Sequence, residues 1–304
     1  MPTILGTANG LYFILSGYFN LEKEFKNVTD IKKFYKNKII YILLPFLGFN
    51  LFWVVWDYIH EFGGIDAVGL LNTFFRAVVD TSAKGHMWFM YLLFGMLLST
   101  PFLSKTLHSM NEKELKMLWR IAIWFNIIAF YVCGNFGIDF NVSAWLLDGW
   151  LIYYVSGYYF RHVIVKESSI KWISLCAFGY LVTCFGVNSL LPVFPQFLGG
   201  TDIQPMFTIF CLGFLFIWNR YVVINNETVG KAISFVGSHI YLVYLFHIRG
   251  MEYAVRKLHV VNTGLVSWLI VIFGTFAFSF VASVIVDLPM KPVQKFIDKI
   301  WTVK

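Results

Sequence analysis

Histidines and carboxylates occur inside or beside long apolar stretches of this sequence, where they can exchange protons next to a membrane-borne substrate. His86 precedes the apolar run 87–98, and His247 lies inside another such run. Histidine titrates near neutral pH, so a histidine beside a carboxylate can act as a general base. Asp148 and Glu252 are predicted to lie at the same level of the membrane as these histidines. The candidate catalytic residues are therefore His86, His247, Asp148 and Glu252.

Each of these residues also has a purely structural interpretation. His86 can be an interfacial residue without chemistry, and Asp148 is open to either interpretation. Arg249 and Glu252 are three residues apart, a spacing at which they can simply pair with each other on a helix. Trp88 is typical of the aromatic belt at a membrane surface, together with Trp53, Trp56 and Trp145, but it can also stack against a sugar ring.

The composition identifies the class of protein that carries these residues. Of the 304 residues, 58% are hydrophobic and only 13% are charged, whereas an average soluble domain has roughly 25% charged residues. We therefore predict an all-α integral membrane protein, a polytopic bundle of transmembrane helices. The net charge of +7 does not indicate a nucleic-acid partner, because the basic residues fall in short segments between apolar runs.

Several kinds of chemistry find no support in the sequence. The four cysteines lie inside apolar runs without a CxxC pair, so neither a disulfide framework nor a metal site is expected. The sequence contains no Walker loop, GxSxG elbow or HExxH motif. ATP-driven transport and metalloprotease chemistry are therefore not supported.

About nine apolar ranges have the length that a bilayer requires. They are 4–20, 39–60, 86–103, 118–136, 144–161, 171–191, 203–219, 233–249 and 263–286. The stretch Ala67–Val79 is too short to span and is expected to lie at the interface, with Phe74 and Phe75 on its apolar side.

The distribution of lysine and arginine predicts an orientation in the cell membrane. Nineteen of the 24 basic residues fall in alternate connecting segments and in the tail 287–304, a strong positive-inside bias. The C-terminus is therefore predicted to be cytoplasmic. Nine spans would then put Met1 outside the cell, so the distribution of basic residues predicts one further span before the first one.

The segment 21–38 is crowded with lysines and has two interpretations. It contains six of them, including Lys33, Lys36 and Lys38. One interpretation is anchoring to anionic lipid, at about 1 kcal/mol per basic residue. The other is a docking site for a phosphate-rich donor, because residues 33–38 mix cations with aromatic rings that would suit a nucleotide.

Four stretches, in this order, resemble the integral-membrane acyltransferase family 3. Residues 13–19 (FILSGYF) resemble its F-x-L-S-G-Y span, and residues 34–45 (FYKNKIIYILLP) resemble its basic loop and following span. Residues 85–92 (GHMWFMYL) are similar to its H-x-W-F-L span, and residues 238–247 (SHIYLVYLFH) to its late S-x-x-I-Y-L-x-H segment. The likeness covers nearly the whole chain as one domain, residues 1–304.

The resemblance implies an O-acyltransferase of the cell envelope. It would move an acyl group, most simply acetyl, from acyl-CoA to a hydroxyl of a surface sugar or polysaccharide, with no bound cofactor. The family normally has ten spans, and its first carries a catalytic histidine that this sequence lacks. The family's R-x-x-R pair corresponds here to Lys38 and Tyr41. The residues implied for the donor are Lys33, Lys36, Lys38 and Tyr41, and Trp88 is implied for the acceptor.

Two other functions remain open from the sequence. A transporter or flippase of a lipid-linked sugar would use the same polar residues as a substrate path. A catalytically inactive fragment of the acyltransferase fold would keep the helices without the essential base.

Overall fold

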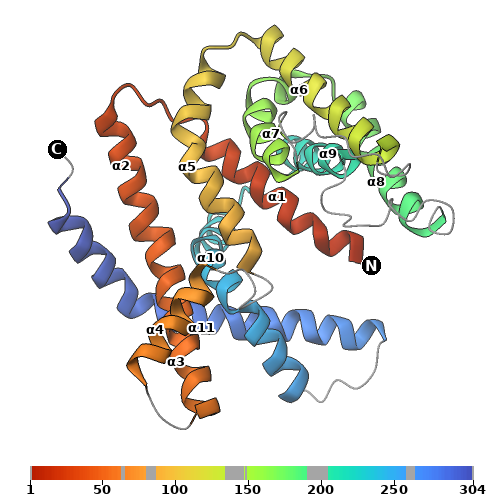
Figure 1. Ribbon diagram of the computed structural model, residues 1–304. Coiled ribbons are helices and arrows are strands. Elements are labelled where there is room, and N and C mark those ends of the chain that lie inside the picture. Colours follow the sequence, from red (N-terminus) through yellow and green to blue (C-terminus); the bar gives the residue numbers. More distant parts are fainter. Residues whose placement is uncertain are drawn as a thin grey trace. The chain divides into compact units, whose positions relative to one another are not determined.

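The computed structural model describes residues 2–62, 66–79, 87–133, 147, 149–189, 205–257 and 264–302, and every regular element in these ranges is helical (Figure 1). The elements are α1 (Pro2–Asn20), α2 (Val28–Lys38), η1 (Ile39–Leu43), α3 (Leu44–Phe62), α4 (Ala67–Val79), α5 (Trp88–His108), α6 (Glu112–Ile127), η4 (Ile128–Cys133), α7 (Trp150–His162), η7 (Ile164–Lys166), α8 (Ser169–Ser189), α9 (Pro205–Tyr221), α10 (Glu227–Lys257) and α11 (Leu265–Ile300). The predicted all-α class is confirmed.

The predicted spans coincide with helices wherever the structure describes them. Each of the nine ranges overlaps a helix, and α4 has the bounds predicted for the interfacial helix. Among the described residues, four helical stretches are long and apolar enough to cross a membrane: Val28–Trp56, Trp88–His108, Glu227–Lys257 and Leu269–Ile300. Ser169–Leu181 and Met206–Tyr221 are shorter apolar helices. The fold is that of a helical membrane bundle.

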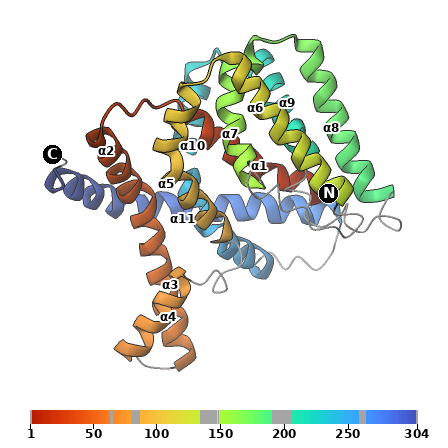
Figure 2. The same cartoon turned by 45° about the horizontal axis from the view of Figure 1, so that its top comes forward.

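The chain forms two compact units, each built from two separate segments. The first unit contains Met1–Asn27 and Phe89–Val223, and the second contains Val28–Trp88 and Ile224–Lys304. In the first unit α1 packs along α7, and α8 packs along α9 (Figure 2).

Glycines set the contact between α1 and α7 in the first unit. A Cβ atom at Gly17 would overlap the carbonyl of Tyr154, and one at Gly157 would overlap the backbone of Ile14 and Tyr18. The two backbones therefore touch where each helix lacks a side chain. Small residues are the usual means by which membrane helices approach this closely.

The second unit is organised around the antiparallel pair α10 and α11. Gly250 of α10 faces Ser279 and Thr275 of α11 so closely that a Cβ atom would overlap Ser279 Oγ. Further along, His239 of α10 lies beside Asp287 of α11. Because the residue numbers rise along one helix and fall along the other, the helices run in opposite directions, as the predicted topology requires.

The lysine-rich segment, expected as a loop, is largely helical. α2 continues through the π-helical turn η1 into α3. Asp30 lies in the first turn of α2 and Lys36 and Lys38 in the last, an arrangement that complements the helix dipole. The loop expectation was wrong for residues 28–38, because charge density alone does not distinguish an exposed helix from a loop.

Two backbone carbonyls of the π-turn accept hydrogen bonds from side chains of the neighbouring helices. Tyr241 of α10 donates a hydrogen bond to the Ile42 carbonyl at 2.7 Å, and Gln294 of α11 donates to the Ile40 carbonyl at 3.3 Å. α11 extends well past the predicted end of its span, through Pro289 and Pro292 to Ile300. This extension carries Gln294 to the π-turn.

Introducing a methyl group at Gly17 tests the contact between α1 and α7. We expect Gly17→Ala to destabilise the protein by about 3 kcal/mol or more, because overpacking alone costs about 1–3 kcal/mol and here the clash is with backbone. Thermal unfolding of the purified protein in detergent measures the effect. Gly95→Ala is the control, since a Cβ atom at Gly95 meets nothing within 4 Å. Equal stability of the two variants would contradict the close contact.

Candidate functional site

Three cavities follow one another along α3 and α10 in the second unit. The first lies beside Tyr41 and Tyr241, the second beside Phe49 and Leu245, and the third beside Trp56 and Tyr253. Residue numbers rise along both helices in this order, so α3 and α10 run in the same direction. From Tyr41 to Trp56 a helix rises about 22 Å, which is most of the thickness of a bilayer's hydrocarbon core.

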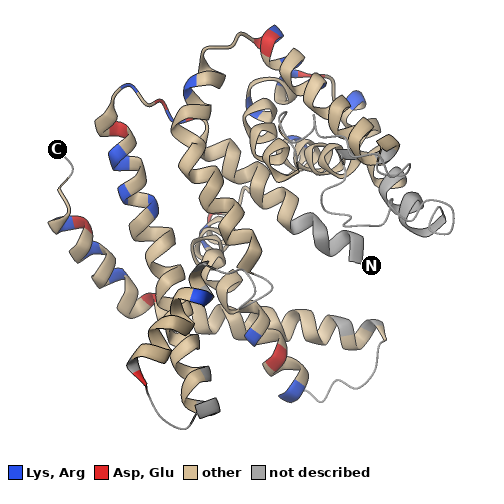
Figure 3. Cartoon of the chain, in the orientation of Figure 1, with Lys and Arg blue, Asp and Glu red and all other residues tan. Residues whose placement is uncertain are grey.

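The basic cavity, about 450 Å³, lies at the lysine-rich end of this series. Its lining combines two lysines, one carboxylate, hydroxyls and an amide with apolar residues: Tyr41, Pro45, Ser238, Tyr241, Leu242, Asp287, Met290, Lys291, Gln294 and Lys295. Figure 3 shows basic residues on α2 and on the last turns of α11. Lys36 Nζ lies 2.7 Å from Asp298 Oδ1 and ties these two segments together. The cavity can therefore receive an anionic ligand.

A buried histidine–carboxylate pair lies at the basic cavity. His239 is 2% exposed, and its Nε2 lies 3.1 Å from Asp287 Oδ2. Its Nδ1 lies 2.8 Å from the Phe235 carbonyl. Nδ1 also lies 3.0 Å from Ser238 Oγ, so both ring nitrogens have hydrogen-bonding or ionic partners. Asp287, which lines the cavity, also forms an ion pair with Lys291.

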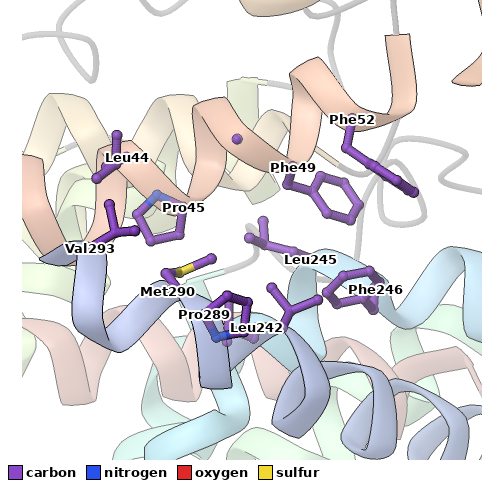
Figure 4. Close-up of a pocket in the computed structure, with 12 residues that line it drawn as sticks. Leu44, Pro45, Phe49, Phe52, Leu242, Leu245, Phe246, Pro289, Met290 and Val293 are labelled. Carbon is purple, nitrogen blue, oxygen red and sulfur yellow. The ribbon is translucent and has the colours of Figure 1, made fainter. Parts of the chain in front are cut away.

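The apolar cavity, about 460 Å³, is the middle one. α3 contributes Leu44, Pro45, Gly48, Phe49 and Phe52, α10 contributes Leu242, Leu245 and Phe246, and α11 contributes Val286, Pro289, Met290 and Val293. Figure 4 draws these twelve residues around the space between the three helices and labels ten of them. None of the twelve carries a polar side chain, so this cavity suits a hydrocarbon group.

The aromatic cavity, about 330 Å³, ends the series. It is lined by Phe52, Trp53, Trp56, Arg249, Glu252, Tyr253, Arg256 and Phe278. The Arg249 guanidinium lies 4.4 Å from the centre of the Trp53 ring and donates a hydrogen bond to Glu252 at 3.0 Å. Among the described residues nothing accepts a hydrogen bond from the buried Trp53 Nε1. Aromatic faces beside hydrogen-bonding groups can bind a polar ring.

The structure describes two of the four candidate catalytic residues. Glu252 lines the aromatic cavity and pairs with Arg249, as their spacing suggested. His247 is half-buried, and its Nδ1 contacts the carbonyl of Tyr244. His86 and Asp148 lie outside the described residues.

The expected donor residues have different surroundings. Tyr41 lines the basic cavity, whereas Lys33 is exposed on α2. Lys36 is engaged with Asp298, and the Lys38 ammonium lies 5.1 Å from the centre of the Phe34 ring. The lining lysines are instead Lys291 and Lys295, from the tail that continues α11.

Trp88, the expected acceptor residue, is the first residue of α5 and is half-buried. It is not among the residues that line the three cavities, and the tryptophans of the aromatic cavity are Trp53 and Trp56. Sequence reasoning had assigned these two to the interfacial belt.

Sequence reasoning also did not select His239 and Asp287. A signal was available, because His239 lies in one apolar run and Asp287 ends the next one. Consecutive membrane spans run antiparallel. A residue near the start of one span can therefore meet a residue near the end of the next span. Within the described part of the chain, no group of three or more histidine, cysteine, aspartate or glutamate residues is placed to hold a metal ion.

Comparison with known families gives this helical membrane protein its class. The family model described as an acyltransferase domain, that of acyltransferase family 3, matches residues 2–284. The match covers nearly the whole chain, so the protein belongs to this family of membrane acyltransferases and the sequence resemblance is confirmed. No curated protein and no solved structure matches the chain.

Replacing Asp287 tests the buried pair. We expect Asp287→Asn to lower the free energy of unfolding by about 1–3 kcal/mol, because it removes the carboxylate partner of a buried imidazole. Combined with His239→Ala, it should show a coupling of about 1 kcal/mol, measured by denaturant unfolding in micelles. The control is Glu227→Gln, which breaks an exposed ion pair with Lys231 and should cost less than about 1 kcal/mol. Additive effects of the His239 and Asp287 substitutions would contradict the pairing.

Proposed function

We propose that this protein transfers an acyl group from acyl-CoA to a hydroxyl of a cell-surface sugar or polysaccharide. The observation that carries the proposal is the order of the three cavities along α3 and α10: basic, apolar, aromatic. An acyl thioester has an anionic end and an apolar acyl chain, and a sugar acceptor has hydroxyls on a ring. The cavities offer a complementary environment for each part.

The donor binds in the basic cavity. Lys291 and Lys295 attract the phosphates of CoA as point charges, and Tyr41 offers an aromatic face to the adenine ring. The lysines of α2 add to the positive potential at this end, and Lys36 holds α2 against α11. This end corresponds to the cytoplasmic side in the topology that the basic residues predict.

The acceptor binds in the aromatic cavity. A sugar ring stacks on Trp53 or Tyr253, and its hydroxyls form hydrogen bonds with Arg249 and Glu252. This end corresponds to the outer side in the predicted topology.

The reaction needs a base that takes the proton of the attacking hydroxyl. As the sugar oxygen bonds to the acyl carbon, the carbon–sulfur bond breaks and CoA leaves as the thiol, with the proton returned to sulfur. His247 and Glu252 are the described residues that we assign to this proton transfer, with Glu252 nearer the acceptor because it lines that cavity. His86 and Asp148 remain candidates for the same task.

Transport of a lipid-linked sugar is less well supported. A sugar head group crossing the bilayer would require polar side chains along its path, and the middle cavity has none among its lining residues. Acyl transfer does not require a polar head group to pass through the apolar cavity.

Labelled acyl transfer tests the proposed function. Cells with and without the gene are given radiolabelled acetate, and label in the surface glycan is measured. We expect deletion to remove part of the label and the intact gene to restore it. Unchanged labelling of the glycan after deletion would refute acyl transfer to surface glycan. Acyl transfer by the purified protein without any labelled glycan product would indicate a different acceptor.

Lysine substitutions test the donor site. In proteoliposomes, Lys291→Ala and Lys295→Ala should each raise the KM for acyl-CoA about tenfold, because each removes one charge-assisted contact worth about 1.5 kcal/mol. The penalty should shrink as salt is added. Lys299→Ala is the matched control, since Lys299 lies on the same helix but is not a lining residue. Equal KM values for all three variants would place the donor elsewhere.

Substitutions on α10 test the proton transfer. Glu252→Gln and His247→Ala should lower kcat by about 100-fold or more where the residue acts as general base, measured at saturating acyl-CoA. Glu227→Gln, on the same helix and fully outside the cavities, is the control. Full activity of both Glu252→Gln and His247→Ala would remove these residues from the mechanism.

A further inference from the structure

The lining of the aromatic cavity carries more positive than negative charge. Its charged residues are two arginines, Arg249 and Arg256, and one carboxylate, Glu252. Arg249 donates a hydrogen bond to Glu252 at 3.0 Å, so these two charges offset each other. Arg256 is exposed and forms no ion pair with any residue that the structure describes. One positive charge of the lining is therefore not offset within the cavity.

This end of α10 is an exception to the distribution of basic residues. Nineteen of the 24 basic residues fall on the predicted cytoplasmic side, and Arg249, Arg256 and Lys257 are three of the remaining five. Membrane orientation favours lysine and arginine on the cytoplasmic side. It gives no reason for three cations to gather at the opposite end of a helix, whereas recognition of an anionic ligand does.

Glu252 and Arg256 lie one helical turn apart on the same face of α10. Four residues correspond to a rise of about 6 Å, and side chains at this spacing are neighbours on the helix surface. Trp53 and Tyr253 supply the aromatic faces of the same cavity. A sugar ring held against these faces can therefore present one hydroxyl to Glu252 and another substituent of the ring to Arg256.

We propose that the aromatic cavity binds a sugar that carries a carboxylate, a uronic acid, and that Arg256 binds this carboxylate. The inference rests on the proposed function, because it takes the acceptor as the ligand of this cavity. A planar guanidinium pairs with a carboxylate through two parallel hydrogen bonds, which a neutral hydroxymethyl group cannot match. Arg249 offsets the charge of Glu252, which would otherwise repel the carboxylate of the sugar.

Binding of two matched sugars tests the inference without an acyl donor. Methyl glucuronide and methyl glucoside differ only in having a carboxylate or a hydroxymethyl group on the same ring. Each is titrated into the protein in nanodiscs of phosphatidylcholine, and binding is followed by saturation-transfer NMR. We expect the unmodified protein to bind the glucuronide about tenfold more tightly, the gain from one hydrogen-bonded contact between charged groups. This preference should shrink as salt is added.

Substitutions near the end of α10 assign the preference to one side chain. Arg256→Gln should bind the two sugars equally, and Arg256→Lys should keep only part of the preference, because lysine lacks the planar fork. Lys257→Gln is the matched control, since it removes a charge from the neighbouring exposed position, which does not line the cavity. It should keep the full preference. The same loss in Lys257→Gln as in Arg256→Gln would reduce the effect to general attraction and overturn the inference.

The outcomes distinguish this inference from the proposed function. Equal affinity of the unmodified protein for the two sugars, or binding of neither, overturns the inference. An anionic phospholipid retained by the unmodified protein in native mass spectrometry and lost in Arg256→Gln, without a preference for the glucuronide, assigns Arg256 to lipid and also overturns it. A glucuronide preference that Arg256→Gln abolishes, together with unchanged glycan labelling after deletion of the gene, supports the inference and refutes the proposed function. Loss of the glycan label on deletion, with equal affinities for the two sugars, does the reverse.

Discussion

Close approach of helix backbones at glycine is the constraint on which both units depend. Lipid tails are as apolar as leucine, so membrane helices gain little from hydrophobic burial against each other and rely on tight packing. Gly17 and Gly157 bring α1 against α7, and Gly250 brings α10 against α11. In the second unit this contact fixes the pairing of α10 with α11. That pairing then brings His239 beside Asp287 and aligns the walls of the basic and apolar cavities.

Several polar groups inside the apolar helices form hydrogen bonds within their own helix. Asn50, Thr100 and Asn126 each form a hydrogen bond with the carbonyl one turn earlier in their own helix. The π-turn Ile39–Leu43 departs from this pattern, because its carbonyls accept hydrogen bonds from Tyr241 and Gln294 of other helices. π-turns often mark functional sites, and this one contains Tyr41, which lines the basic cavity. The irregular turn thus ties α3 to both α10 and α11 at the proposed donor site.

The cavities bring together residues that are far apart in the sequence. The lysines of α2 and those of the tail lie at one end of α3 and α10, where Lys36 meets Asp298. Arg249, Glu252 and two tryptophans form the other end. A wholly apolar section separates them. Under the proposed function, the charged donor and the hydroxylated acceptor would therefore have different surroundings along the same helices.

The sequence by itself determined the helical membrane class, the approximate positions of the helices, the bounds of α4 and membership of the acyltransferase family. These follow from hydropathy, helix length and short motifs, which are local properties of the chain. Only the tertiary structure decided which side chains meet. His239 and Asp287 are 48 residues apart, and neither has a sequence neighbour that indicates its partner. Lys291 and Lys295 read as a basic tail because nothing local shows that α11 continues through two prolines. Trp53 and Trp56 read as interfacial anchors because a cavity arises from the packing of three helices, and no single helix contains that information.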